Sequence, residues 1–230
     1  MSASLKPVDG RRLYQQVADQ IRDLIRVGHF LPSDRLPAER DLALQIGVSR
    51  PSLREGLIAL EIEGSVEIRM GSGVYVCARP PQADLSTKPM GESPSELMQA
   101  RAAIEGSVVA LAAARTTPEA IVELKLANEA MRSAIAAERS PLEPDRRFHR
   151  TIAELTGNSV MVRLVTELFD ERHQPMSAQI QTRYESQQTW MSAVTEHAAI
   201  IRALEAAHPL LAQAAMQNHL EASRLRWIGP

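Results

Sequence analysis

Residues 36–57, LPAERDLALQIGVSRPSLREGL, constrain the fold more than any other stretch of the chain. An amphipathic segment carrying Leu42 and Ile46 is followed by a turn at Gly47, and a second helical segment begins at Arg50. A short turn that contains glycine is the usual connection between two steeply crossing helices. The stretch therefore predicts a helix-turn-helix, and a second helix of this kind fits the major groove of B-DNA.

The flanking segments complete a winged helix-turn-helix. Downstream, two short alternating runs within residues 64–76 are joined by a glycine-containing turn, which predicts a β-hairpin, or wing. Upstream, apolar residues recur at helical spacing and predict a first helix on which the other two pack: Tyr14, Val17, Ile21, Leu24 and Ile25. We therefore assign residues 1–78 to a DNA-binding domain of three helices and a hairpin.

Composition excludes several classes of protein. The 230 residues contain no apolar run long enough to span a membrane and no apolar N-terminal segment typical of a secretory signal. The single cysteine, Cys77, excludes an internal disulfide framework, and we interpret it as a small apolar residue at a strand end. These features predict a cytoplasmic protein that does not associate with membranes.

Charge gives little support to nucleic-acid binding by one copy of the chain. The net charge is −2, and acidic and basic residues nearly balance in the N-terminal domain, so the chain has no strongly basic surface. DNA binding would then depend on a few local arginines and on a dimer, in which phosphate contacts from two copies add up.

A linker separates this domain from a helical half. Residues 79–93 are rich in proline and show no periodicity, which is typical of a linker. Residues 94–230 show almost no strand signal, and capping side chains precede proline at Pro94, Pro118 and Pro141. The pattern predicts an all-α bundle of about six helices, near residues 94–115, 118–138, 141–156, 159–183, 187–207 and 209–226, and Pro175 should kink or divide the fourth. The fold class is mainly α.

Four ionisable residues fall within the apolar faces of these helices. Asp145 and His149 lie one turn apart on the third, while His197 and His219 lie in phase with the apolar stripes of the fifth and sixth. Burial of such groups is costly unless they are paired or bind a metal, and one carboxylate with three imidazoles suits Zn²⁺ or another divalent first-row ion. The alternative is that these residues are hydrogen-bonded core residues. His173 also falls in phase with an apolar stripe, and we interpret it as structural.

Several of these motifs together resemble those of the GntR family of bacterial regulators. The resemblance lies in residues 36–43 (LPAERDLA), residues 48–50 (VSR) and the wing sequence 71–76 (GSGVYV). The helical half resembles the FCD ligand-binding domain of the FadR-like branch. The matching elements there are Arg101 with Glu105, Asp145 with His149, Glu196-His197 and His219-Leu220.

This resemblance implies a set of DNA-contacting residues. Arg40, Arg50 and Arg54 match positions that contact DNA, Ser49 and Ser52 match phosphate- or base-contacting positions, and Gly71 matches the glycine of the wing tip. The planar guanidinium of arginine suits such contacts because it can bind guanine or a phosphate with two hydrogen bonds. An alternative for Arg40 is capping or an ion pair with Glu39. Ser33 stands where many relatives have glycine.

The resemblance also implies an effector site in the helical half. Asp145, His149, His197 and His219 match metal ligands, and the metal would be Zn²⁺ or Ni²⁺. Arg101 matches a position that helps to hold an effector carboxylate, and its alternative role is a salt bridge to Glu105. Asn158 would donate to the effector or merely cap the next helix.

Together these features predict a ligand-responsive transcription regulator, most simply a repressor. It would bind a palindromic operator in double-stranded DNA as a homodimer and respond to a small carboxylate, with sugar acids such as hexuronates as candidates. One alternative is a metal-dependent hydrolase or lyase that acts on a small carboxylate, because an open position on the metal can activate water. The other is an architectural module that uses the winged helix to bind protein.

Overall fold

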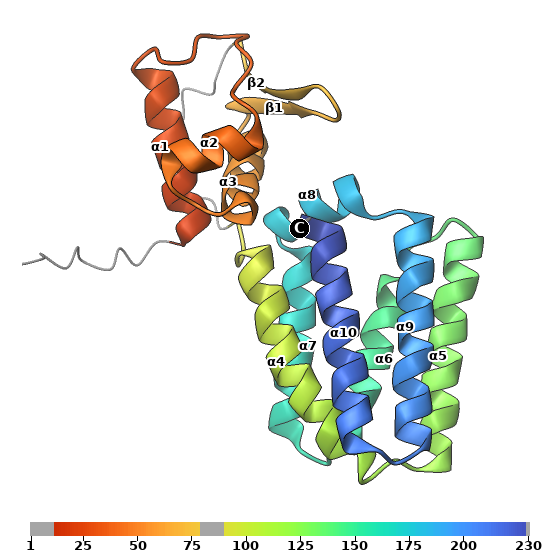
Figure 1. Ribbon diagram of the computed structural model, residues 1–230. Helices are drawn as coiled ribbons and strands as arrows, with labels where there is room; N and C mark the ends of the chain where they lie inside the picture. The colour runs from red at the N-terminus through yellow and green to blue at the C-terminus, as the bar shows by residue number, and fades with distance from the viewer. Residues whose placement is uncertain (1–11, 79–89, 229–230) are drawn as a thin grey trace, which may run out of the picture. The chain divides into compact units, whose positions relative to one another are not determined.

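The computed structural model describes residues 12–78 and 90–228 and divides into two compact units, Met1–Ser93 and Pro94–Pro230 (Figure 1). The first unit holds, in chain order, α1 (Leu13–Arg26), α2 (Glu39–Ile46), α3 (Arg50–Ile62), β1 (Val66–Arg69) and β2 (Gly73–Val76). The predicted winged helix-turn-helix, with three helices and a hairpin, is thus confirmed.

Two glycines let the three helices pack. Gly47 ends α2 with a φ of 78°, a left-handed conformation that side-chain-bearing residues rarely adopt. Gly56 lies in α3 where α1 crosses it, and a Cβ added there would lie only 2.6 Å from Cγ1 of Val17. The close approach of α1 to α3 therefore requires a residue without a side chain at position 56.

The wing is a two-stranded antiparallel hairpin supported by an additional chain segment. Val66 pairs with Val76 and Ile68 with Val74. The amide of Leu36 donates to the carbonyl of Val74 (2.8 Å), so residues just before α2 cover the outer edge of β2. Sequence periodicity did not reveal this third segment because it is too short to show a pattern.

The last residues of the predicted linker bind to the first unit. Residues 79–89 lie outside the described part of the chain. After them, Tyr14 donates its hydroxyl to the carbonyl of Gly91 (3.0 Å), Ser93 donates to the buried Glu55 (2.8 Å), and Met90 is buried. The compact N-terminal unit therefore extends to Ser93, where the sequence had suggested residue 78.

The second unit is an all-α bundle. It contains α4 (Pro94–Ala113), α5 (Pro118–Ala136), α6 (Leu142–Leu155), α7 (Ser159–Asp170), the 3-10 turn η2 (Glu171–His173), α8 (Pro175–Tyr184), α9 (Gln187–Glu205) and α10 (Pro209–Ile228). The predicted fourth helix is divided, as Pro175 indicated, into α7 and α8. No helix within residues 12–78 or 90–228 is both long and apolar enough to cross a bilayer.

Packing brings α4, α6, α9 and α10 around one interior region, and α5 packs beside them. The helix α10 packs against α4 and α9, and α6 packs against α4 and α5 (Figure 1). Between α5 and α9 the core is apolar, with Met131, Ile135 and Val194 buried. Polar side chains from α4, α6, α9 and α10 replace this apolar core elsewhere in the bundle, and they form the site described below.

Ser33 offers a test of backbone strain in the first unit. It has a φ of 72°, in the left-handed region that disfavours side-chain-bearing residues. We expect Ser33→Gly to raise the free energy of unfolding by about 0.5–1 kcal/mol, because relief of strain exceeds the larger backbone entropy of glycine in the unfolded chain.

The opposite change at Gly47 is the matched control for Ser33→Gly. A Cβ there would have nothing within 4 Å, so Gly47→Ala tests strain alone. We expect it to lower the free energy of unfolding by about 1 kcal/mol. Scanning calorimetry of the full chain measures both, and equal stability of Ser33→Gly and wild type would contradict the strain argument.

Candidate functional site

The predicted DNA-contacting residues lie in three places on the first unit. Ser49 caps α3 by accepting a hydrogen bond from the Ser52 amide (3.2 Å), and the two hydroxyl oxygens are 2.8 Å apart. Gly71 is exposed at the tip of the wing with a φ of 72°. The side chains of Ser49 and Ser52 thereby fix the start of α3, and the glycine leaves backbone atoms exposed at the wing tip.

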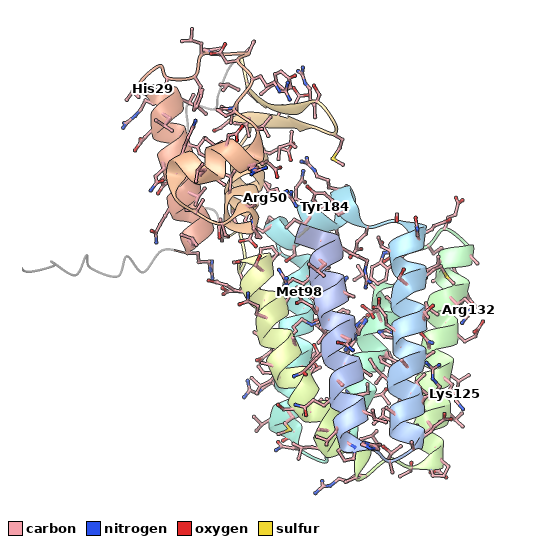
Figure 2. All side chains as sticks on the ribbon, viewed as in Figure 1. His29, Arg50, Met98, Lys125, Arg132 and Tyr184 are labelled. Carbon is pink, nitrogen blue, oxygen red and sulfur yellow. The ribbon has the colours of Figure 1, made fainter. Side chains whose placement is uncertain are left out.

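The three arginines differ in their pairing. Arg50, which is labelled in Figure 2, and Arg40 are exposed and have no ion pair among the described residues. Arg54 is half-buried and binds Glu39, with a distance of 2.7 Å between Nη2 and Oε2. Glu39 therefore forms its ion pair with Arg54, and Arg40 does not adopt the alternative role of an ion-pair partner for Glu39.

The four ionisable residues expected to hold a metal come together inside the second unit. Asp145 and His149 come from α6, His197 from α9 and His219 from α10, and all are at most 4% exposed. Oδ1 of Asp145 lies 3.6 Å from Nε2 of His149 and 3.4 Å from Nε2 of His197. One ring nitrogen of each histidine lies within 4.8 Å of the others.

Two further carboxylates orient two of the histidines. Nδ1 of His149 lies 2.5 Å from Oε2 of Glu105, on α4, and Nδ1 of His219 lies 2.8 Å from Oε2 of Glu196, on α9. Because an ionised carboxylate only accepts, each Nδ1 carries a hydrogen, and in the neutral ring each Nε2 is then left with a free lone pair. Carboxylates arranged behind histidines in this way fix the ligands of metal sites.

The inner atoms of this cluster have no hydrogen-bond partner among the described residues. They are Oδ1 of Asp145, Nε2 of His149 and both ring nitrogens of His197. An unsatisfied buried polar atom costs about 1–3 kcal/mol, so four in one place call for an explanation. A divalent cation would satisfy Oδ1 of Asp145, Nε2 of His149 and one ring nitrogen of His197, and this donor set is one that Zn²⁺ and Ni²⁺ accept. The residues present therefore fit the expected metal.

Electrostatics divides the cluster into charged and neutral members. Burial opposes ionisation of Glu105, but Arg101 and His149 outweigh it and lower the pKa of Glu105 to about 2. Burial likewise opposes ionisation of Asp145, whose pKa is nevertheless lowered by the nearby His149 and Arg172. Burial lowers the pKa of both His197 and His219, which favours the neutral rings that coordinate metals.

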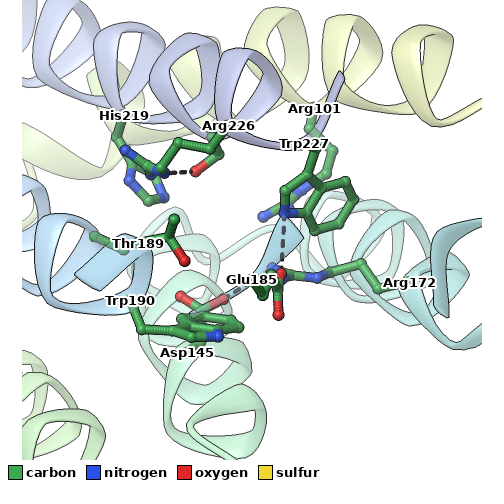
Figure 3. A pocket seen from close by; sticks show the side chains of 11 residues that line it. Arg101, Asp145, Arg172, Glu185, Thr189, Trp190, His219, Arg226 and Trp227 are labelled. Carbon is green, nitrogen blue, oxygen red and sulfur yellow. Dashed lines mark hydrogen bonds and ion pairs between the residues drawn. The ribbon is translucent and has the colours of Figure 1, made fainter. Parts of the chain in front are cut away.

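A small cavity opens beside these residues. Its wall includes Asp145, His219, Arg101 and Arg172 together with two tryptophans (Figure 3). Nε of Arg101 binds Glu105 (2.7 Å), while its buried Nη2 has no hydrogen-bond partner in the described chain. The cavity measures about 20 Å³, room for about one water molecule.

The comparisons with known proteins agree with this architecture. Residues 13–76 match the family model "Bacterial regulatory proteins, gntR family", and residues 96–222 match the model "FCD domain". The chain belongs to the GntR family. This confirms the resemblance seen in the helix-turn-helix, the wing and the helical half.

Individual GntR-family relatives match along most of the chain. The Exu regulon transcriptional regulator of Escherichia coli K12 is 36% identical over 94% of this chain and 84% of its own. The Uxu operon transcriptional regulator of the same strain is 35% identical over 95% of this chain and 88% of its own. The solved structure of Streptococcus agalactiae GntR has a TM-score of 0.50, with 24% identity, over 92% of this chain and 98% of that one, and so supports the fold.

Asn158 and His173 both lie apart from the cluster formed by Asp145 and the three histidines. Asn158 is exposed and caps α7, accepting hydrogen bonds from the amides of Val160 (3.0 Å) and Met161 (3.4 Å), and it does not line the cavity. The structure thus favours its capping alternative over effector binding. His173 is exposed, and its Nδ1 donates to the carbonyl of Asp170, apart from the three clustered histidines.

Three further polar residues complete the cluster of Asp145 and the histidines, and the sequence pattern singled out neither Arg172 nor Glu185. Arg172 lies within the predicted fourth helix, residues 159–183, and Glu185 lies in the connection before the predicted helix 187–207, and nothing in the periodicity marks either as interior. Glu196 was visible only as the neighbour of His197. The break before Pro175 was the one available signal, because it changes which side chains face the interior.

Two histidine substitutions separate a metal-binding role from a structural one. In chelator-treated protein, we expect His197→Leu to retain or raise the free energy of unfolding by up to about 2 kcal/mol, because it removes two unsatisfied ring nitrogens. His149→Leu should lower it by about 3–5 kcal/mol, because Glu105 and Asp145 lose their shared partner.

Scanning calorimetry of the full chain measures both histidine variants. A loss of about 2 kcal/mol or more in His197→Leu would show that this histidine is a core residue and not an unsatisfied ligand.

Proposed function

We propose that this GntR-family regulator is a repressor that binds a palindromic operator as a homodimer, in the cytoplasm, and responds to a sugar acid bound with a divalent metal. The single observation that carries the effector site is the cluster of unsatisfied donor atoms on Asp145, His149 and His197 beside a free guanidinium nitrogen of Arg101. The family and the named relatives point to a DNA-binding regulator and not to an enzyme.

The effector chemistry follows from the side chains around the cavity. Asp145, His149, His197 and His219 would hold the metal, and a bound divalent ion supplies open positions for carboxylate and hydroxyl oxygens. Arg101 has Nη2 free to donate to a carboxylate while Nε stays on Glu105. The named relatives regulate the Exu regulon and the Uxu operon. A metal beside Arg101 would accept hydroxyl and carboxylate oxygens together, which favours a hydroxylated carboxylate as the ligand.

The DNA-binding proposal depends on the exposed start of α3. Arg50 lies at the first position of that helix, where side chains face the base edges when a recognition helix enters the major groove. Arg40, Ser49 and Ser52 flank it and supply further polar contacts, and Gly71 lets the wing backbone approach DNA closely. Arg54 would contact DNA only if it released Glu39 or bound Glu39 and DNA at the same time.

The metal-stripped full chain tests the effector proposal. We expect Zn²⁺ or Ni²⁺ to raise the unfolding temperature, and galacturonate or glucuronate to raise it further only with metal, since a ligand at about 100 times its dissociation constant adds about 2.7 kcal/mol. His197→Leu should abolish both shifts. His173→Ala is the matched control, because that histidine is exposed and lies outside the cluster, and equal shifts in both variants would contradict the proposed site.

Fluorescence anisotropy tests the DNA contact on a duplex selected by the wild-type chain from a random library. We expect Arg50→Ala to weaken binding by about 10- to 100-fold, the value of a bidentate base contact. Arg132→Ala is the control, because Arg132 is an exposed arginine on α5 paired only with Glu129. Wild-type affinity of Arg50→Ala would refute a role for this residue at the interface.

A further inference from the structure

Glu185 already supplies a carboxylate to Arg172, an arginine that lines the cavity. It follows α8 at the connection to α9, and its Oε1 accepts hydrogen bonds from Nη2 of Arg172 (3.0 Å) and from Nε1 of Trp227 (2.9 Å; Figure 3). The side chain is 13% exposed. An interior guanidinium is therefore neutralised by a carboxylate from the bundle's own edge.

Arg172 is built to hold a carboxylate in this position. Its guanidinium carbon lies 4.7 Å from the ring centre of Trp227 and 5.3 Å from that of Trp190, so two aromatic faces fix its plane. Nη1 binds Asp145 (3.0 Å), which leaves Nη2 for a second carboxylate. A fixed guanidinium recognises carboxylates by geometry, whether they belong to a side chain or to a ligand.

The ionised form of Glu185 is only partly stabilised at this position. Burial raises its pKa, and the nearby Arg172 offsets this only in part, so the ionised side chain is less favourable here than in water. A carboxylate whose burial cost is only partly offset can be exchanged for another that makes better contacts in the cavity.

Space for the exchange lies on the outer side of Glu185. Glu185 and Trp190 line both the inner cavity of about 20 Å³ and an outer hollow of about 400 Å³. The outer hollow is also bounded by Arg139, which is exposed and has no ion pair in the described chain. A Glu185 side chain that turned outward would thus leave the inner cavity and meet an available guanidinium.

We infer that Glu185 occupies the place of an effector carboxylate on Arg172, and that the effector binds by displacing it toward the outer hollow. This inference rests on the proposed function, since it concerns the same ligand site. The displacement opens the inner cavity and moves the α8–α9 connection, so that occupancy of Arg172 is coupled to the conformation of one end of the bundle.

Neutralising Glu185 tests the exchange. In the zinc-loaded full chain, we expect Glu185→Gln to bind galacturonate about 10-fold more tightly than wild type, because the ligand no longer competes with a charged hydrogen-bonded carboxylate. Glu185→Ala should act in the same direction. Glu138→Gln is the matched control, since Glu138 lines the same outer hollow and has no ion pair in the described chain, and its affinity should equal that of wild type.

Trp227 reports the displacement directly. The chain has two tryptophans, so Trp190→Phe leaves Trp227 as the only one and keeps an aromatic face on Arg172. Ligand should shift the Trp227 emission in this background, because its indole loses the bond to Glu185. The shift should be smaller when Glu185→Gln is added, and circular dichroism confirms that each variant is folded.

Acetate separates failure of the exchange from failure of the proposed effector class. If galacturonate binds wild type and Glu185→Gln equally, the exchange is refuted and the effector site stands. If Glu185→Gln gains affinity for acetate while galacturonate binds neither protein, the exchange stands and the sugar-acid proposal fails. Binding of neither acid to either protein refutes both.

Discussion

The helical half depends on a buried row of ion pairs and hydrogen bonds between ionisable side chains. In spatial order the row is Arg101, Glu105, His149, Asp145, Arg172 and Glu185, and each member contacts the next. It joins α4 to α6, η2 and the α8–α9 connection. Removal of one member leaves its neighbours buried without compensation, which costs several kcal/mol, so these elements are held in register by charge as well as by apolar packing.

The same row gives a reason for the ligand to be an anion. Its arginines and carboxylates nearly balance, and a divalent cation among Asp145 and the histidines would add positive charge in a region from which water is almost excluded. A carboxylate ligand would restore the balance, and the unpaired Nη2 of Arg101 is placed to bind it. The unsatisfied atoms of His197 lower stability in the free protein, as is common where binding groups are held ready for a ligand.

The sequence predicted the parts of this molecule that depend on local pattern. Periodicity and caps located the helices, and four ionisable residues on apolar faces located the cluster, because burial of such groups is rarely accidental. It did not locate Arg172 or Glu185, whose roles arise from the break before Pro175 and from contacts between elements far apart in the chain. Asn158 shows the converse limit, since a motif position does not reveal whether a side chain faces a cavity or caps its own helix.

Exchange of one carboxylate for another has a consequence for specificity. The bonds that Arg172 makes to a ligand carboxylate replace bonds of the same kind to Glu185, so this contact contributes little net free energy of binding. Discrimination among acids then comes from groups that Glu185 lacks, such as hydroxyl oxygens that reach the metal or Arg101. An effector shifts a conformational equilibrium only by its difference in affinity for the two states. The ligand carboxylate would therefore favour the arrangement in which Glu185 is displaced. The ligand hydroxyl groups would determine which acid binds that arrangement tightly enough to shift the equilibrium.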